Sequence, residues 1–141
     1  MKSATFTNTS DQTVTFTTAA LALTGTTPAD NDSASVNSTT GHTNVLLTFN
    51  FDVDPTSLAA SEFSASTGTW AVNSGATSDA GPNQIEIDAS TALPPGDYTF
   101  TLKMGATIDD AEATPSTYTQ AADKVIHFSV AAPAPAAPAC F

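Results

Sequence analysis

Two histidines, His42 and His127, are the side chains of this sequence best suited to act as general bases near neutral pH. A serine or threonine nucleophile would need such a base within hydrogen-bonding reach and a third group to orient it. His42 lies in the turn-like stretch Thr40–Thr43, and alternation places His127 on the outward face of a predicted strand. No serine occupies a Gly-x-Ser-x-Gly motif. The sequence therefore favours a protein without a catalytic site.

Acidic side chains gather in one loop, where Asp109, Asp110 and Glu112 could supply oxygen ligands to Ca²⁺. Asp52 and Asp54 could lie near one end of the same fold. Ca²⁺ usually takes about six to eight oxygen ligands, and a single loop of this kind supplies fewer. A carboxylate pair for glycoside hydrolysis would need a deep cleft, which a small all-β domain rarely forms. We therefore predict no metal and no cofactor, with a structural Ca²⁺ at this loop as the alternative.

Trp70 and Tyr98 could form a sugar-stacking surface, but each lies in an alternating stretch where a core position is the more common outcome. Cys140 is the only cysteine, so the chain can form neither an intramolecular disulfide nor a cysteine metal cluster. Its neighbours offer no positive charge that would activate the thiol. We therefore assign these residues no functional role.

The charge of the chain excludes two classes of partner. Its 141 residues include 3 basic residues against 14 acidic ones, for a net charge of −11. Nucleic acids and anionic lipid surfaces both attract basic patches, so we expect neither a nucleic-acid partner nor a membrane. The opening residues lack the apolar core of a signal peptide. We expect that either a leader has been removed or the protein assembles inside the cell that makes it.

Alternation of apolar and polar residues is the main structural signal, and it recurs about every 10–15 residues between turn-forming clusters. The clearest runs are Val45–Val53 and Tyr98–Met104. Weaker runs lie at Thr5–Asn8, Thr13–Thr17, Phe63–Val72, Gln84–Asp88 and Lys124–Val130. Asp54 followed by Pro55 predicts a single helical turn. About seven or eight such strands predict an all-β, two-layer antiparallel β-sandwich.

We predict three segments: an arm or hairpin over residues 1–20, the sandwich over 21–130, and a tail over 131–141. The arm has β propensity, whereas the Ala/Pro-rich tail cannot pair in a sheet and should lie outside the core. The predicted core consists of Val45, Leu47, Phe49, Phe51, Trp70, Ile85, Ile87, Phe100, Leu102, Ile126 and Phe128.

Five stretches resemble, in order, the motifs of the bacterial immunoglobulin-like domain of S-layer and other surface proteins, which also occurs in phage structural proteins. They are a proline-aspartate turn, an apolar strand, an acidic proline corner, a Pro-Gly turn with a tyrosine-bearing strand, and a closing strand. The stretches are Thr27–Asp30, Val45–Phe51, Val53–Leu58, Leu93–Leu102 and Ile126–Val130. Gly105–Ala113 lacks the Gly-Asn that the family usually carries there. The resemblance implies an immunoglobulin-like β-sandwich that is not an enzyme.

Two functions fit this interpretation. The first is a bacteriophage virion component, such as a capsid decoration protein on the virion surface, bound to major capsid protein, to other virion proteins or to itself. The second is a module of a bacterial surface adhesin or S-layer protein, at the cell surface or secreted. Either implies protein partners within an oligomer or larger assembly. The predicted subunit contacts lie in the arm and tail, at Phe6, Val14, Phe16, Pro133, Pro135, Pro138 and Phe141.

Overall fold

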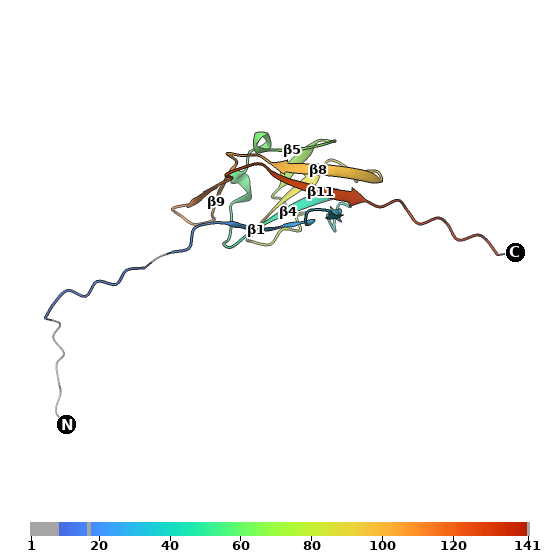
Figure 1. Cartoon of the computed structure of the whole chain (residues 1–141). Coiled ribbons are helices and arrows are strands. Elements are labelled where there is room, and N and C mark those ends of the chain that lie inside the picture. The colour runs from blue at the N-terminus through green and yellow to red at the C-terminus, as the bar shows by residue number, and fades with distance from the viewer. Residues whose placement is uncertain (1–8, 17, 141) are drawn as a thin grey trace, which may run out of the picture.

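The computed structural model describes residues 9–16 and 18–140. Two β-sheets pack face to face, and an extended segment leaves each end of the sandwich (Figure 1). The first sheet is ordered β1 (Leu23–Thr27), β4 (Thr43–Phe49), β7 (Gln84–Ala89) and β6 (Trp70–Asn73), with β3 (Ser35–Val36) also paired to β4. The second is ordered β2 (Asp32–Ser33), β11 (Lys124–Val130), β8 (Gly96–Leu102) and β5 (Phe63–Ala65). A separate ribbon pairs β9 (Thr107–Asp109) with β10 (Thr117–Thr119). The predicted all-β sandwich is confirmed.

The pair β8–β11 forms the longest antiparallel ladder, from Lys124 opposite Leu102 to Val130 opposite Gly96. Ile126 lies opposite Phe100 in this register, and both side chains are buried. Side chains alternate between the two faces of a strand. The residues that precede and follow Ile126 on β11, and Phe100 on β8, therefore point away from the core. The strict alternation in sequence therefore produces one apolar face that packs on the first sheet.

Aromatic side chains form the centre of the core. The ring of Phe100 on β8 lies 5.8 Å from that of Phe63 on β5 and 5.8 Å from that of Trp70 on β6. The Trp70 ring also meets Phe128 of β11 at 6.3 Å in an edge-on arrangement. Because β6 belongs to the first sheet and the other strands to the second, Trp70 bridges the two layers. All the predicted core residues except Phe51 are buried.

Phe51 was predicted to be buried, and the structure shows that its side chain is 43% exposed. The alternating run breaks because β4 ends at Phe49 and the next residue, Asn50, turns towards the start of the chain. Asn50 donates from Nδ2 to the carbonyl of Ala20 at 2.9 Å and accepts at Oδ1 from the N–H of Ala22 at 2.8 Å. The polar anchor thus ends the strand at Phe49, four residues before the predicted run Val45–Val53 ends.

Two other predicted runs extend beyond the strands that form. β8 ends at Leu102, and Met104 lies in a turn with its side chain 68% exposed, next to Gly105 at a φ of +84°. The run Phe63–Val72 was predicted as one strand, but it contains β5 and β6, which belong to opposite sheets. Gly68, at a φ of +79°, lies in the crossing between them and adopts a conformation that favours glycine.

The predicted arm strands are not found where the structure describes the chain. Residues 13–16 form no strand, and Val14 and Phe16 are 68% and 85% exposed. Thr5–Asn8 and Thr17 lie outside the described residues. Short strands rich in Thr, Ser and Gly, such as β1 and β10, were not predicted because they lack a regular apolar face.

The predicted helical turn after Asp54 is confirmed as a short 3₁₀ turn over Pro55–Ser57. The Asp54 carboxylate accepts a hydrogen bond from the N–H of Thr56 at 2.9 Å, which caps the first turn. A second 3₁₀ turn follows over Ala60–Glu62 and leads directly into β5. No helix in the described part of the chain is long and apolar enough to span a membrane.

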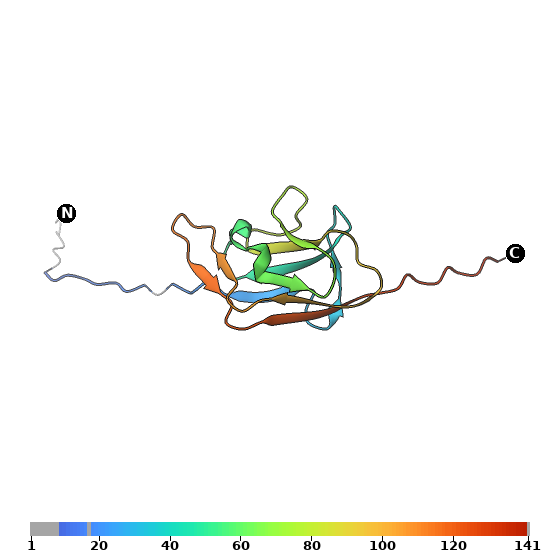
Figure 2. The same ribbon diagram turned by 90° about the horizontal axis from the view of Figure 1, so that it is seen from above.

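The chain enters and leaves the sandwich at opposite ends, as the two views in Figures 1 and 2 agree. The arm reaches β1 at the end that also holds the β9–β10 ribbon, and the tail continues from the far end of β11. Residues 131–140 of the tail are exposed and form no strand, as their alanine and proline content leads one to expect.

The buried Phe49 and the exposed Phe51 provide a matched pair for testing the core. We expect Phe49→Ala to lower the free energy of unfolding by about 3–5 kcal/mol, because Phe49 is 1% exposed and its ring meets that of Tyr118 at 5.8 Å. Phe51→Ala should cost about 1 kcal/mol or less. Urea unfolding of both variants measures the difference, and equal losses would show that the position of the β4 end is wrong.

Candidate functional site

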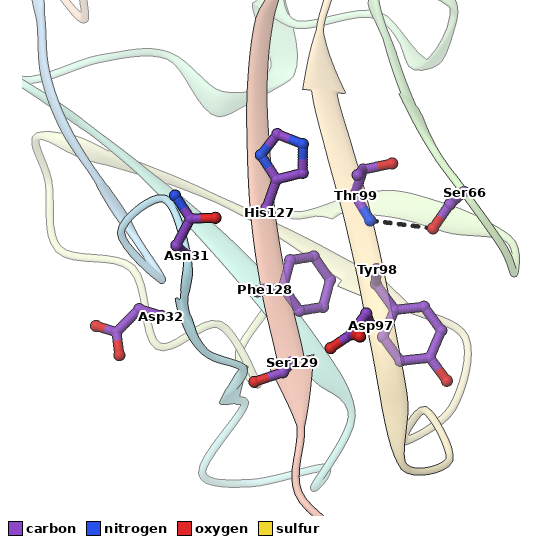
Figure 3. A pocket seen from close by; sticks show the side chains of 9 residues that line it. All are labelled: Asn31, Asp32, Ser66, Asp97, Tyr98, Thr99, His127, Phe128 and Ser129. Carbon is purple, nitrogen blue, oxygen red and sulfur yellow. Dashed lines mark hydrogen bonds between the residues drawn. The ribbon is translucent and has the colours of Figure 1, made fainter.

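An open pocket of about 400 Å³ lies on the outward face of the second sheet, over β8 and β11 (Figure 3). Polar side chains of both strands line it in register, with His127 opposite Thr99 and Ser129 opposite Asp97. Asn31 and Asp32 border it from the β2 side and Ser66 from the β5 side. Tyr98 and Phe128 also line it, so the pocket combines polar side chains with aromatic surface from neighbouring strands of the second sheet.

Asp30 and His127 form a close carboxylate–imidazole contact beside this surface. The Oδ1 atom of Asp30 accepts a hydrogen bond from the N–H of His127 at 2.8 Å and also lies 2.8 Å from its ring Nδ1. The backbone N–H and then the ring of His127 lower the pKa of the Asp30 carboxyl below its usual value. Both side chains remain about half exposed, so the pair ties the β2 segment to β11 in contact with solvent.

This Asp–His pair has no nucleophile beside it in the described residues, because no hydroxyl group there forms a hydrogen bond with the His127 ring. Of the two serines that line the pocket, Ser129 forms no hydrogen bond with this ring, and Ser66 accepts at Oγ from the N–H of Thr99 at 3.0 Å. The predicted outward position of His127 is therefore correct, and its partner Asp30 was missed. The geometry supports a structural contact and offers no Ser–His–Asp arrangement.

The outward face of the first sheet carries a buried carboxylate that the sequence did not single out. Glu86 of β7 is 0% exposed, and its Oε1 accepts from Nδ2 of Asn37 at 2.8 Å and Nδ2 of Asn44 at 2.6 Å. Its Oε2 accepts from Oγ of Ser78 at 2.8 Å and from the N–H of Asp79. Burial raises the pKa of Glu86, but these hydrogen bonds outweigh that effect and hold it below its usual value. Glu86 thus fastens two loops to the sheet.

Asp88 lies two residues further along the same face of β7, and its carboxylate has fewer hydrogen-bond partners than that of Glu86. Its Oδ2 accepts from Nδ2 of Asn73 at 2.9 Å, whereas its buried Oδ1 has no hydrogen-bond partner among the described residues. Burial, and next the neighbouring Glu86, raise the pKa of Asp88 to about 6. A pair of neighbouring carboxyl groups such as Glu86 and Asp88 could suggest acid–base chemistry. Glu86 is fully buried, however, and therefore cannot contact a substrate.

The acidic residues considered as calcium ligands come together at one end of the sandwich. Val53 and Asp110 form an isolated antiparallel bridge there, so the Asp52–Asp54 corner lies beside the Asp109–Glu112 loop. Several of their carboxylates bind the local backbone or a hydroxyl group instead of converging on one point. These contacts join Asp54 to the N–H of Thr56 at 2.9 Å, Asp110 to the N–H groups of Glu112 at 3.3 Å and Ser116 at 3.1 Å, and Asp109 to Oγ1 of Thr117 at 2.5 Å.

Across residues 9–16 and 18–140, no three His, Cys, Asp or Glu side chains are arranged to hold a metal ion. The carboxylates of Asp109 and Asp110 instead hold the connection between β9 and β10. The absence of a cofactor stays a prediction.

The remaining candidate residues divide between core and surface. Trp70 is buried and donates from Nε1 to the carbonyl of Thr67 at 2.8 Å, and the half-buried Tyr98 donates from its hydroxyl to the carbonyl of Pro94 at 2.6 Å. The Trp70 ring belongs to the core and is not free to stack on a sugar, whereas the Tyr98 ring packs on Phe128 at 5.8 Å and borders the open pocket. Cys140 is exposed in the tail. The predicted contact residues Val14, Phe16, Pro133, Pro135 and Pro138 are exposed, and Phe6 and Phe141 lie outside the described residues.

Comparison with known proteins decides the family. The family model described as a bacterial Ig-like domain matches residues 17–130, which include every strand of both sheets. The chain belongs to this family. The resemblance stated from the sequence is thereby confirmed, and bacterial Ig-like domains of this type are typically structural modules found in bacterial surface proteins. No curated protein matches the chain.

The raised pKa of Asp88 predicts an unusual dependence of stability on pH. The folded state binds a proton at Asp88 near pH 6, whereas an ordinary aspartate in the unfolded chain does so near about pH 4. The folded state therefore holds more protons in between, and the free energy of unfolding should rise as the pH falls from about 7 to about 5. Urea unfolding across this range measures the change.

Asp88→Asn should remove that rise, because an amide does not titrate. Asp97→Asn, which changes an exposed acid on β8, is the matched control and should leave the rise in place. A wild-type profile that persists in Asp88→Asn would show that another group causes it.

Proposed function

We propose that this bacterial Ig-like domain is a non-enzymatic structural module that joins and spaces its neighbours in an assembly at a bacterial surface. The observation that carries the proposal is the path of the chain, which enters at one end of the sandwich and leaves at the other (Figures 1 and 2). A module with this path sets a fixed distance between the proteins attached to its two ends.

The segments at both ends of the sandwich, the arm and the tail, have features that suit a connecting module. On the arm side, Asn50 holds the chain through three hydrogen bonds, two to Ala22 at 2.8 and 3.1 Å and one to Ala20 at 2.9 Å. On the tail side, the strand β11 passes directly into an exposed Ala/Pro-rich segment, and such segments act as semi-rigid extended spacers. A net charge of −11 keeps neighbouring modules apart in a crowded layer.

A second candidate function, a component of the virion surface such as a capsid decoration protein, is favoured by the arm. Val14 and Phe16 place apolar side chains in solvent, and the described stretch of the arm from 9 to 16 forms no strand. Such a segment gains stability by adding to the edge of a neighbour's sheet, in a major capsid protein, another virion protein or a second copy. The arm and tail would then supply the subunit contacts, without nucleic acid, membrane or cofactor.

Antibodies against residues 21–130 separate the two settings. Binding to intact bacterial cells supports the surface module, and binding to purified phage particles supports the virion component. If the protein is present in the lysate and the antibodies bind neither intact cells nor phage particles, both placements are overturned.

The arm contact has its own test. We expect the double substitution Val14→Ser and Phe16→Ser to leave the folded sandwich unchanged and to reduce incorporation into the native assembly at least about tenfold, because two exposed apolar anchors are lost. The double substitution Thr13→Ser and Thr15→Ser is the matched control. Quantitative blotting of purified assemblies measures incorporation. Undiminished incorporation of the variant with Val14→Ser and Phe16→Ser would show that the arm is a passive extension.

A further inference from the structure

The exposed Phe51 side chain lines a groove of about 720 Å³ at the arm end of the sandwich. Three segments form its walls: the root of the arm at residues 18–21, the corner after β4 at 50–52, and the β9–β10 connection at 110–116. Figures 1 and 2 place the arm and the β9–β10 ribbon together at this end. The groove is as large as the pockets in which proteins bind ligands.

Hydrogen bonds hold the walls of this groove to one another. Asn50 binds the arm root through its Nδ2, which donates to the carbonyl of Ala20 at 2.9 Å. On the other side, the N–H of Ala111 donates to the carbonyl of Asp52 at 3.0 Å. A groove whose walls are already ordered costs a partner less conformational entropy on binding.

Apolar side chains from all three walls line the groove, namely Leu21, Phe51 and Ala113. Phe51 is 43% exposed, although an aromatic ring gains free energy when it is buried. A single apolar side chain on a surface needs no special explanation, whereas several that line one groove mark an interaction surface. The groove therefore has an unfilled apolar part.

The same groove is acidic. Asp52, Asp110 and Glu112 line it, and none of the described residues that line it is basic. Asp52 and Glu112 are exposed, whereas one oxygen of Asp110 accepts from the N–H groups of Glu112 and Ser116. Carboxylates next to an aromatic ring suit a guanidinium group, which donates hydrogen bonds in its plane and stacks on a ring face.

We propose that the Phe51 groove binds a segment of a partner protein in which arginine lies next to apolar residues. That a neighbour sits at this end of the module rests on the proposed function. The guanidinium pairs with the carboxylates of Asp52 and Glu112 and packs on the Phe51 ring. An apolar neighbour of the arginine covers Leu21. The groove thus selects a basic partner at the point where the arm leaves the sandwich.

Charge decides against a second copy of this chain as the occupant. The sequence contains no arginine and three lysines, and its net charge is −11. Two copies therefore repel each other as they approach. The tail at residues 131–141 carries no charged side chain that could pair with the carboxylates of the groove.

The proposal is tested with the full chain and a fluorescent synthetic peptide that alternates arginine and leucine. A matched peptide carries glutamine in place of each arginine. We expect the arginine peptide to bind at least about tenfold more tightly, because only arginine supplies both charge and stacking. Added salt should reduce this difference, since it screens exposed charges. Fluorescence anisotropy measures both affinities.

Variants of the groove locate the binding. Phe51→Ser should weaken binding of the arginine peptide at least about fivefold through loss of the ring. The double substitution Asp52→Asn and Glu112→Gln should weaken it by at least about as much and remove most of its salt dependence. Urea unfolding of each variant checks that the sandwich remains folded.

Matched controls change the same chemistry elsewhere on the surface. Met104→Ser removes another exposed apolar side chain, which is 68% exposed. The double substitution Asp32→Asn and Asp97→Asn removes two exposed acids beside the second sheet. Both controls should change the affinity for the arginine peptide less than about twofold.

The outcomes separate the groove from the proposed function. Equal binding of the two peptides, or undiminished binding by Phe51→Ser, would overturn the groove. Self-association of the wild-type chain that Phe51→Ser abolishes would assign the groove to a second copy and also overturn the proposal. No peptide binding, together with antibodies that bind intact cells, would leave the connecting role in place. Tight, Phe51-dependent peptide binding with antibodies that bind neither surface would overturn that role and retain the groove.

Discussion

The packing of Phe100 against Phe63 and Trp70 is the interaction on which the rest of the structure depends. The chain has one cysteine and no disulfide to hold its layers, so the two sheets stay together through their buried faces. Trp70 reaches this cluster from the first sheet, and Phe100 and Phe63 from the second. Once these rings are buried, β6 and β8 are placed, and their hydrogen-bonded neighbours β7 and β11 follow in register.

Buried and half-exposed acidic side chains fasten loops and strands around the core. Glu86 is buried on the outward face of the first sheet and binds four neutral donors, so it holds the loops around Asn37 and Ser78 without a cationic partner. A composition with 12% charged residues and only three basic ones leaves few alternatives for satisfying such a carboxylate. On the second sheet, the Asp30 carboxylate likewise accepts a hydrogen bond from the N–H of His127 on β11. The acids of this protein thus act mainly as hydrogen-bond acceptors that secure loops and strand ends.

Much of the fold could be predicted from alternation, and most of the polar contacts could not. The run Lys124–Val130 coincides with β11 because its alternation is unbroken. The end of β4 was missed because it depends on Asn50 binding a segment 28 and 30 residues away. Alternation likewise placed His127 outward, but its partner Asp30 is 97 residues distant. The run Gln84–Asp88 predicted a strand but not the burial of Glu86, since a period of two cannot show that a loop covers the outward face of that strand.

The path of the chain through the sandwich connects these contacts to function. Asn50 fixes the arm at one end, β2 and β11 hold each other along the second sheet, and the tail leaves at the other end. Spin labels at Thr18→Cys and Ala131→Cys, with Cys140→Ser, measure this path directly by electron–electron distance. A single long separation set by the length of the sandwich is the expected result. A short separation, with both labels at the same end, would contradict the connecting role.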